Sequence, residues 1–131
     1  MRVRATARKV SPSDAAELGI DTSYNSEWHL TLGYEYIVYA IRCFPGSAIY
    51  GSSTLYQIVD DGDAFISAPA CLFEITDGRA SSHWRVACGN EGLDIKPEEF
   101  FRNPFLSEEI LDREPAAIEI FRQISCKLKS E

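Results

Sequence analysis

Histidine is scarce in this sequence, and its cysteines are far apart. The only histidines are His29 and His83, and none of the four cysteines belongs to a Cys-x-x-Cys pair. Structural zinc sites need closely spaced ligand pairs, so the sequence predicts no metal site. Three of the cysteines lie in apolar segments and are expected to be reduced thiols in the core: Cys43, Cys71 and Cys126.

Long apolar runs are missing as well. No stretch approaches the roughly 18 apolar residues that a membrane-spanning helix needs. Residues 1–9 lack the apolar centre of a secretory signal peptide. A chain of 131 residues is long enough to bury its own core. We therefore expect one domain, residues 1–131, in the cytoplasm.

The common motifs of phosphate binding and nucleophilic catalysis are also absent. The sequence has no Gly-x-Gly-x-x-Gly, no P-loop and no Gly-x-Ser-x-Gly elbow. His83 near Glu74 or Asp77 is a candidate general base, but strand alternation would turn it to solvent with Arg85. The sequence favours a protein that is not an enzyme and has no cofactor.

Acidic residues outnumber basic ones, and the two signs are unevenly distributed. The net charge is −7, yet residues 1–9 hold four basic residues and no acidic one. The rest of the chain carries nine basic and twenty acidic residues. Such a surface repels the phosphates of nucleic acid and attracts a basic partner. The simpler interpretation, that the charge provides solubility, stays open.

Alternating and β-branched segments predict an antiparallel sheet of five to six strands. Residues 2–8 alternate small apolar residues with arginines, which is typical of a half-buried edge strand. Residues 34–44 form the longest β-branched and aromatic run, so we expect one central strand there. Shorter strands are expected at residues 28–32, 55–59, 64–67, 71–75 and 83–88.

Helical patterns flank these strands. Ser11 and Pro12 resemble a capped helix start, and Gly19 a left-handed helix end. After Gly92 we expect only helices, the last of them opening at Pro115. Strands followed by helices indicate an α+β fold with the C-terminal helices packed on one sheet face. One apolar stripe of the last helix should face the sheet: Ala117, Ile120, Phe121, Ile124 and Leu128.

Five carboxylates gather around two turns in a stretch that holds no lysine or arginine. They are Asp60, Asp61, Asp63, Glu74 and Asp77. A calcium loop of the EF-hand type would need glycine at its sixth position and glutamate at its twelfth, whereas this stretch has glycine at the third. A tight Asp-Gly turn explains it better. We expect these five residues to form a partner-binding surface; solvated turn residues are the plain alternative.

Parts of residues 30–124 resemble small bacterial proteins that are similar to immunity proteins of toxin systems, including contact-dependent inhibition. The resemblance rests on Glu35–Ile41, Tyr56–Asp61, Pro69–Asp77, Ser82–Trp84, Pro97–Phe101 and Glu114–Phe121. It implies a protein that binds a cognate toxin domain and occludes its active site. An acidic surface would suit a basic nuclease, because carboxylates can occupy phosphate sites.

Three classes of function remain in view. The favoured one is a non-enzymatic, acidic immunity protein that inhibits a toxin. The second is a small-molecule-binding or enzymatic domain, with a pocket between the sheet and the terminal helix. The third is a structural homodimer joined through an edge strand. Trp28 and Trp84 are expected to pack in the core rather than anchor a partner.

Overall fold

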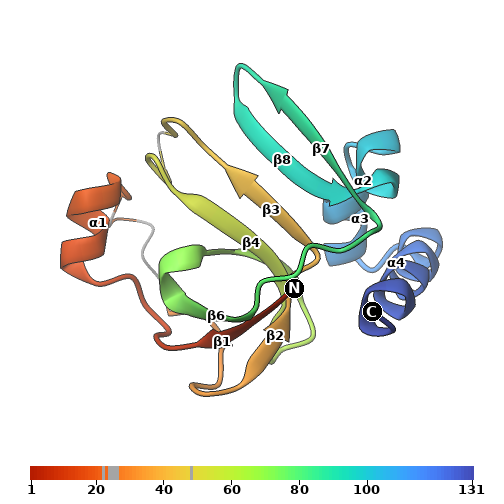
Figure 1. Ribbon diagram of the computed structural model, residues 1–131, viewed down its shortest axis with the longest axis horizontal. Coiled ribbons are helices and arrows are strands. Elements are labelled where there is room, and N and C mark those ends of the chain that lie inside the picture. The colour runs from red at the N-terminus through yellow and green to blue at the C-terminus, as the bar shows by residue number, and fades with distance from the viewer. Residues whose placement is uncertain (22, 24–26, 48) are drawn as a thin grey trace.

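The computed structural model describes residues 1–21, 23, 27–47 and 49–131, which form two antiparallel sheets and several helices (Figure 1). The strands are β1 Arg2–Ala5, β2 Glu35–Ile37, β3 Ala40–Cys43, β4 Thr54–Val59, β5 Phe65–Pro69, β6 Phe73–Asp77, β7 Trp84–Gly89 and β8 Gly92–Pro97. The helices are α1 Pro12–Leu18, the short 3₁₀ helix η2 Ala70–Leu72, α2 Glu98–Arg102, α3 Leu106–Leu111 and α4 Pro115–Lys129. The predicted α+β class is confirmed, but the strands divide between two sheets.

β1 lies at the centre of the three-stranded sheet, whose order is β2-β1-β6. Arg4 stands opposite Glu35 of β2 on one side and opposite Glu74 of β6 on the other. The prediction of an edge strand at residues 2–8 was therefore wrong. Arg4 lies instead between acidic neighbours on both sides, and Arg2 stands opposite Asp77 of β6, where opposite charges across strands are favourable.

The five-stranded sheet has the order β5-β4-β3-β8-β7. The expectation that only helices follow Gly92 was wrong, because β8 pairs with both β3 and β7 before α2 begins. Pro97 ends β8 opposite Trp84, and the helical pattern starts at the next residue. The β7–β8 hairpin extends away from the rest of the molecule in Figure 1.

The run at residues 34–44 serves both sheets and is not one strand. β2 belongs to the small sheet and β3 to the large one, and Val38 and Tyr39 lie between them. The Val38 N–H donates to the carbonyl of Met1, whereas the Tyr39 N–H donates to that of Gln57. The backbone thus changes its pairing partner within two residues.

One hydrophobic core joins the two sheets and is covered by α1. The Ser11 hydroxyl accepts a hydrogen bond from the Asp14 N–H and caps α1, and Gly19 ends the helix with φ 73°. Both helix signals in the sequence are confirmed. The buried residues of this first core are Val3, Ala5, Val10, Ala15, Ile20, Leu30, Tyr36, Val38, Tyr56, Ile58, Leu72 and Trp84.

A second core lies between the large sheet and the C-terminal helices, which stand on the side away from α1 in Figure 1. Its buried residues are Tyr39, Phe65, Phe100, Leu106, Ile110, Ala117, Ile124 and Leu128. The predicted stripe of α4 is only partly buried at Phe121 and is wrong at Ile120, which is exposed. None of the helices formed by the described residues is long and apolar enough to cross a membrane.

Candidate functional site

The predicted carboxylates at residues 60–63 form the turn of the β4–β5 hairpin. The Asp60 side chain accepts hydrogen bonds of 2.9 Å from the backbone N–H groups of Gly62 and Ala64. Asp63 adopts a left-handed conformation with φ 60°, which aspartate tolerates better than most residues. The Asp-Gly turn inferred from the sequence is confirmed. One carboxylate of the predicted partner surface is thus engaged in holding the turn.

Asp61 makes shorter hydrogen bonds than Asp60 does. Its carboxylate accepts hydrogen bonds from the Thr31 hydroxyl at 2.6 Å and from the Tyr36 hydroxyl at 2.7 Å. These two hydrogen bonds hold the pKa of Asp61 below its ordinary value. The Tyr36 hydroxyl also accepts from the Thr31 N–H, so the three residues tie the hairpin to β2.

Replacing Asp61 with asparagine should lower the free energy of unfolding at pH 7 by about 1 kcal/mol, because a neutral amide accepts weaker hydrogen bonds than an exposed carboxylate. The folded-state pKa lies below the unfolded one. The ionised Asp61 side chain therefore stabilises the fold above about pH 4, and this stabilisation is lost as the pH falls through the folded-state pKa. Urea unfolding at pH 7 and pH 3 tests this, since the difference from wild type should shrink at pH 3.

Asp63→Asn is the matched control in the same turn. Among the described residues its carboxylate contacts only Arg113, in an exposed ion pair, so the change in unfolding free energy should stay under about 0.5 kcal/mol. Equal stability of Asp61→Asn and wild type at pH 7 would contradict the role assigned to Asp61.

The other two predicted carboxylates lie on β6, which β1 separates from β2. Glu74 pairs with Arg4 at 3.1 Å, and Asp77 pairs with Arg79 at 2.7 Å. The hydrogen bonds from Arg79 hold the pKa of Asp77 far below its ordinary value. The structure therefore brings together Asp60, Asp61 and Asp63, and places Glu74 and Asp77 at another edge, next to the basic first strand.

A hollow of about 390 Å³ lies between the β4–β5 hairpin, α3 and α4. Sequence analysis placed a possible pocket between the sheet and the terminal helix, and this hollow occupies that position. Its floor is apolar, with Phe121 packed at 4.9 Å from Tyr39 and 5.0 Å from Phe65, measured between ring centroids. The apolar lining comes from Val59, Ala64, Phe65, Ile110, Leu111, Ile118 and Phe121.

The rim of this hollow carries more positive than negative charge. Arg113, Arg122 and Lys129 line it, together with a single carboxylate, that of Asp63. Arg113 pairs with Asp63 at 3.4 Å, and Arg122 pairs with Glu119 of its own helix at 2.8 Å. Within the described part of the chain, Lys129 makes no side-chain ion pair. The rim is thus locally positive in a protein whose net charge is −7.

Sequence analysis predicted a position for a possible pocket but not the residues that line it, although α4 contains a signal for them. Ile118, Arg122, Ser125 and Lys129 recur at intervals of three or four residues, which places them on one helix face. That second stripe borders the hollow, next to the apolar stripe that faces the sheet. Cys126 also lines the hollow and is exposed, so its expected place in the core was wrong.

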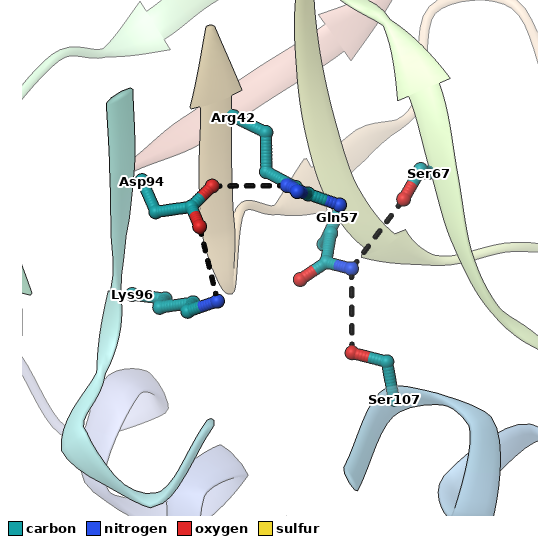
Figure 2. A network of polar contacts seen from close by, with 6 residues as sticks. All are labelled: Arg42, Gln57, Ser67, Asp94, Lys96 and Ser107. Atoms are coloured by element: carbon teal, nitrogen blue, oxygen red, sulfur yellow. Dashed lines mark hydrogen bonds and ion pairs between the residues drawn. The ribbon is translucent and has the colours of Figure 1, made fainter. Parts of the chain in front are cut away.

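A network of polar side chains connects the sheet to the helices (Figure 2). The buried Gln57 amide donates to the hydroxyls of Ser67 on β5 and Ser107 on α3, at 3.4 Å each. Beside it, the Asp94 carboxylate of β8 accepts from Arg42 at 2.9 Å and from Lys96 at 3.3 Å. Figure 2 shows these side chains on the face of the sheet that α3 approaches.

The contacts of this network are those expected of a structural role, in which side chains join the sheet to the helices. Lys96 lies 4.7 Å above the ring of Phe101, which adds a cation–π contact between β8 and α2. No histidine hydrogen-bonds either serine in the described residues, and His83 is exposed in the turn just before β7. Among the described residues no group of three histidine, cysteine, aspartate or glutamate side chains is placed to hold a metal ion. The network therefore holds helices on the sheet.

Comparison of the chain with protein-family models, with curated proteins and with solved structures found no match.

Proposed function

We propose that this chain is a non-catalytic binding protein that inhibits a basic protein partner, in the manner of an immunity protein that occludes a toxin's active site. The observation that carries the proposal is an exposed apolar surface on α3 that is flanked by carboxylates. We call it the α3 surface: Phe105, Glu108, Leu111 and Asp112. It adjoins the predicted acidic hairpin through Arg113, which follows Asp112 and donates to the backbone carbonyl of Asp63 at 3.0 Å.

The α3 surface contributes little to the fold. Phe105 is 62% exposed and Leu111 is 54% exposed, whereas Leu106 and Ile110 of the same helix are buried in the second core. The carboxylates of this surface make no ion pair in the part of the chain that the structure describes. Its side chains are therefore available for another molecule.

The composition of this surface fits a protein partner with a basic face. Interfaces commonly have an apolar or aromatic anchor at the centre and a polar rim around it. Carboxylates that are not neutralised internally can steer a cationic partner and so raise the association rate. The proposal places the chain in the cytoplasm, where its free thiols, Cys43, Cys71, Cys88 and Cys126, stay reduced.

If a toxin domain encoded by a neighbouring gene is the partner, Phe105→Ala should weaken its binding by about 30-fold, the effect of losing a central aromatic anchor. Titration calorimetry of purified chain and toxin domain measures the affinity, and circular dichroism checks the fold. The matched control is Val86→Ala on β7, where the side chain is 67% exposed and lies on the other hairpin. Its affinity should equal that of wild type.

Salt dependence provides the second readout of the same experiment. Glu108→Lys with Asp112→Lys should slow association and flatten its dependence on ionic strength, because screening then has less attraction to remove. Reversal of Asp63 tests the hairpin part of the predicted surface in the same way. Unchanged affinity and unchanged salt dependence in all of these variants would refute the proposed surface, and a toxin domain that does not bind would refute the function.

A second candidate function is small-molecule binding, and the hollow between the hairpin, α3 and α4 supports it. Ligand pockets commonly measure about 300–1,000 Å³ and have apolar walls with a few polar groups. The 390 Å³ hollow with its apolar floor and charged rim meets both conditions.

A further inference from the structure

We propose that the hollow between the β4–β5 hairpin, α3 and α4 binds a free medium-chain carboxylic acid, with the alkyl chain on the apolar floor and the carboxylate at the basic rim. This inference goes beyond inhibition of a protein partner and does not depend on it. The sequence predicted a pocket at this position but no ligand for it, and the proposal names the class of ligand.

The floor fits an alkyl chain. It is built from two strands and two helices, and its aromatic side chains, Phe65 and Phe121, pack against one another. Beneath it, the hydroxyls of Tyr39 and Ser125 are satisfied by a hydrogen bond of 3.1 Å to one another. Most of the surface that a ligand would cover is therefore apolar, and its burial favours a hydrocarbon.

The rim selects the charge of the head group. Arg113 donates to the Asp63 backbone carbonyl at 3.0 Å and reaches the Asp63 carboxylate only in a long, exposed contact of 3.4 Å, which leaves some of its five N–H donors available. Arg122 uses Nε and one terminal nitrogen on Glu119, which leaves the other terminal nitrogen. Lys129 adds a third cation, with no ion-pair partner among the described residues. Charge-assisted hydrogen bonds to such donors are stronger than neutral ones, so an anion is preferred.

The ligand probes are decanoate, decanol and decylammonium, which share one alkyl chain and differ in charge. Calorimetry should show saturable one-to-one binding of decanoate and at least about tenfold weaker binding of decanol, the effect of one charge-assisted hydrogen bond. Decylammonium should bind more weakly than decanol. Octanoate should bind about tenfold more weakly than decanoate, because it lacks two methylenes. Equal affinity for the acid and the alcohol would overturn the proposal.

Two exposed cysteines locate the site within the molecule. Cys126 lines the hollow, whereas Cys88 is exposed on β7, away from it. Saturating decanoate should slow alkylation of Cys126 by iodoacetamide at least fivefold and leave Cys88 unchanged, as read by peptide mass spectrometry. Equal rates at Cys126 with and without decanoate would show that the hollow is empty and would overturn the proposal.

Lys129→Ala should weaken decanoate binding about three- to tenfold, the effect of losing one partly exposed charge contact. The matched control is Lys127→Ala in the same last turn of α4. Lys127 pairs with Glu99 of α2 and does not line the hollow, so its removal should leave decanoate affinity unchanged. Loss of affinity in both variants alike would indicate general electrostatics and contradict a defined site.

Neither result bears on the toxin domain, so the two proposals succeed or fail separately. A chain that binds decanoate but no toxin domain would retain this inference and lose the proposed inhibition.

Discussion

Replacing Ile124 with alanine is expected to lower the free energy of unfolding by about 3–4 kcal/mol, within the range measured for large-to-small changes in protein cores. Ile124 is 1% exposed and lies in the core between α4 and the five-stranded sheet. The substitution removes buried methyl and methylene groups and leaves a cavity that the surrounding helices and strands cannot fully close. Urea unfolding followed by circular dichroism measures the loss.

Ile120→Ala is the matched control, one turn earlier on the same helix. Ile120 is 36% exposed, so the same substitution should cost under about 1 kcal/mol. The two changes have equal effects on helix propensity, so their difference reports burial alone. Equal losses at the two positions would mean that α4 is rotated about its axis relative to the arrangement described above.

Gly92→Ala should destabilise the protein by about 2–5 kcal/mol, from backbone strain and overpacking together. Gly92 has φ 120°, a conformation that other residues rarely adopt. A Cβ atom there would also lie 2.0 Å from the carbonyl oxygen of Cys43, which is backbone of the adjacent strand. Either the β7–β8 hairpin or β3 must then shift, and thermal unfolding should show a large decrease in the melting temperature.

Gly89 provides the control, because it stands opposite Gly92 in the same hairpin. A Cβ atom at Gly89 would meet nothing within 4 Å, and its φ is not positive. Gly89→Ala should therefore keep the stability within about 0.5 kcal/mol of wild type or raise it slightly. If both variants behaved alike, the close approach of Gly92 to β3 would be contradicted.

Local signals in the sequence predicted the elements that local chemistry determines. The Ser11 cap, the Gly19 helix end and the Asp61-Gly62 turn are set by a few neighbouring residues, and all three were correct. The apolar period of α4 located the long terminal helix for the same reason. These features need no knowledge of the rest of the chain.

The errors arose where two segments distant in sequence decide the outcome. Residues 34–44 look like one strand because both faces are apolar. No signal in the local sequence indicates that their side chains are divided between two cores. Leu93 and Ile95 alternate as a strand would, but the Pro-Glu-Glu helix start that follows them obscured β8. Residues 28–32 alternate too, yet they form no strand. Leu30 is nonetheless buried, because the loop packs on the first core.

The candidate sites were predicted to a smaller extent. The sequence located the carboxylates of the hairpin but not the side chains that engage them, since Tyr36 and Arg113 come from distant segments. The basic rim of the hollow joins Arg113 to two residues of α4. The positive charge of this rim cannot be predicted from the net charge of the chain, which is −7.

The abrupt change of partner at Val38 and Tyr39 has a consequence for how the molecule opens. These adjacent residues insert their side chains into different cores, and the indole N–H of Trp84 donates to the Tyr39 carbonyl at 2.9 Å. A fluctuation that releases the C-terminal helices also frees the Tyr39 side chain. Because Val38 is the preceding residue in the chain, its packing in the first core is disturbed as well. The two cores should therefore unfold as one cooperative unit. In the Ile124→Ala variant, amide hydrogen exchange should accelerate in β1 as well as in α4, although β1 lies wholly on the other core.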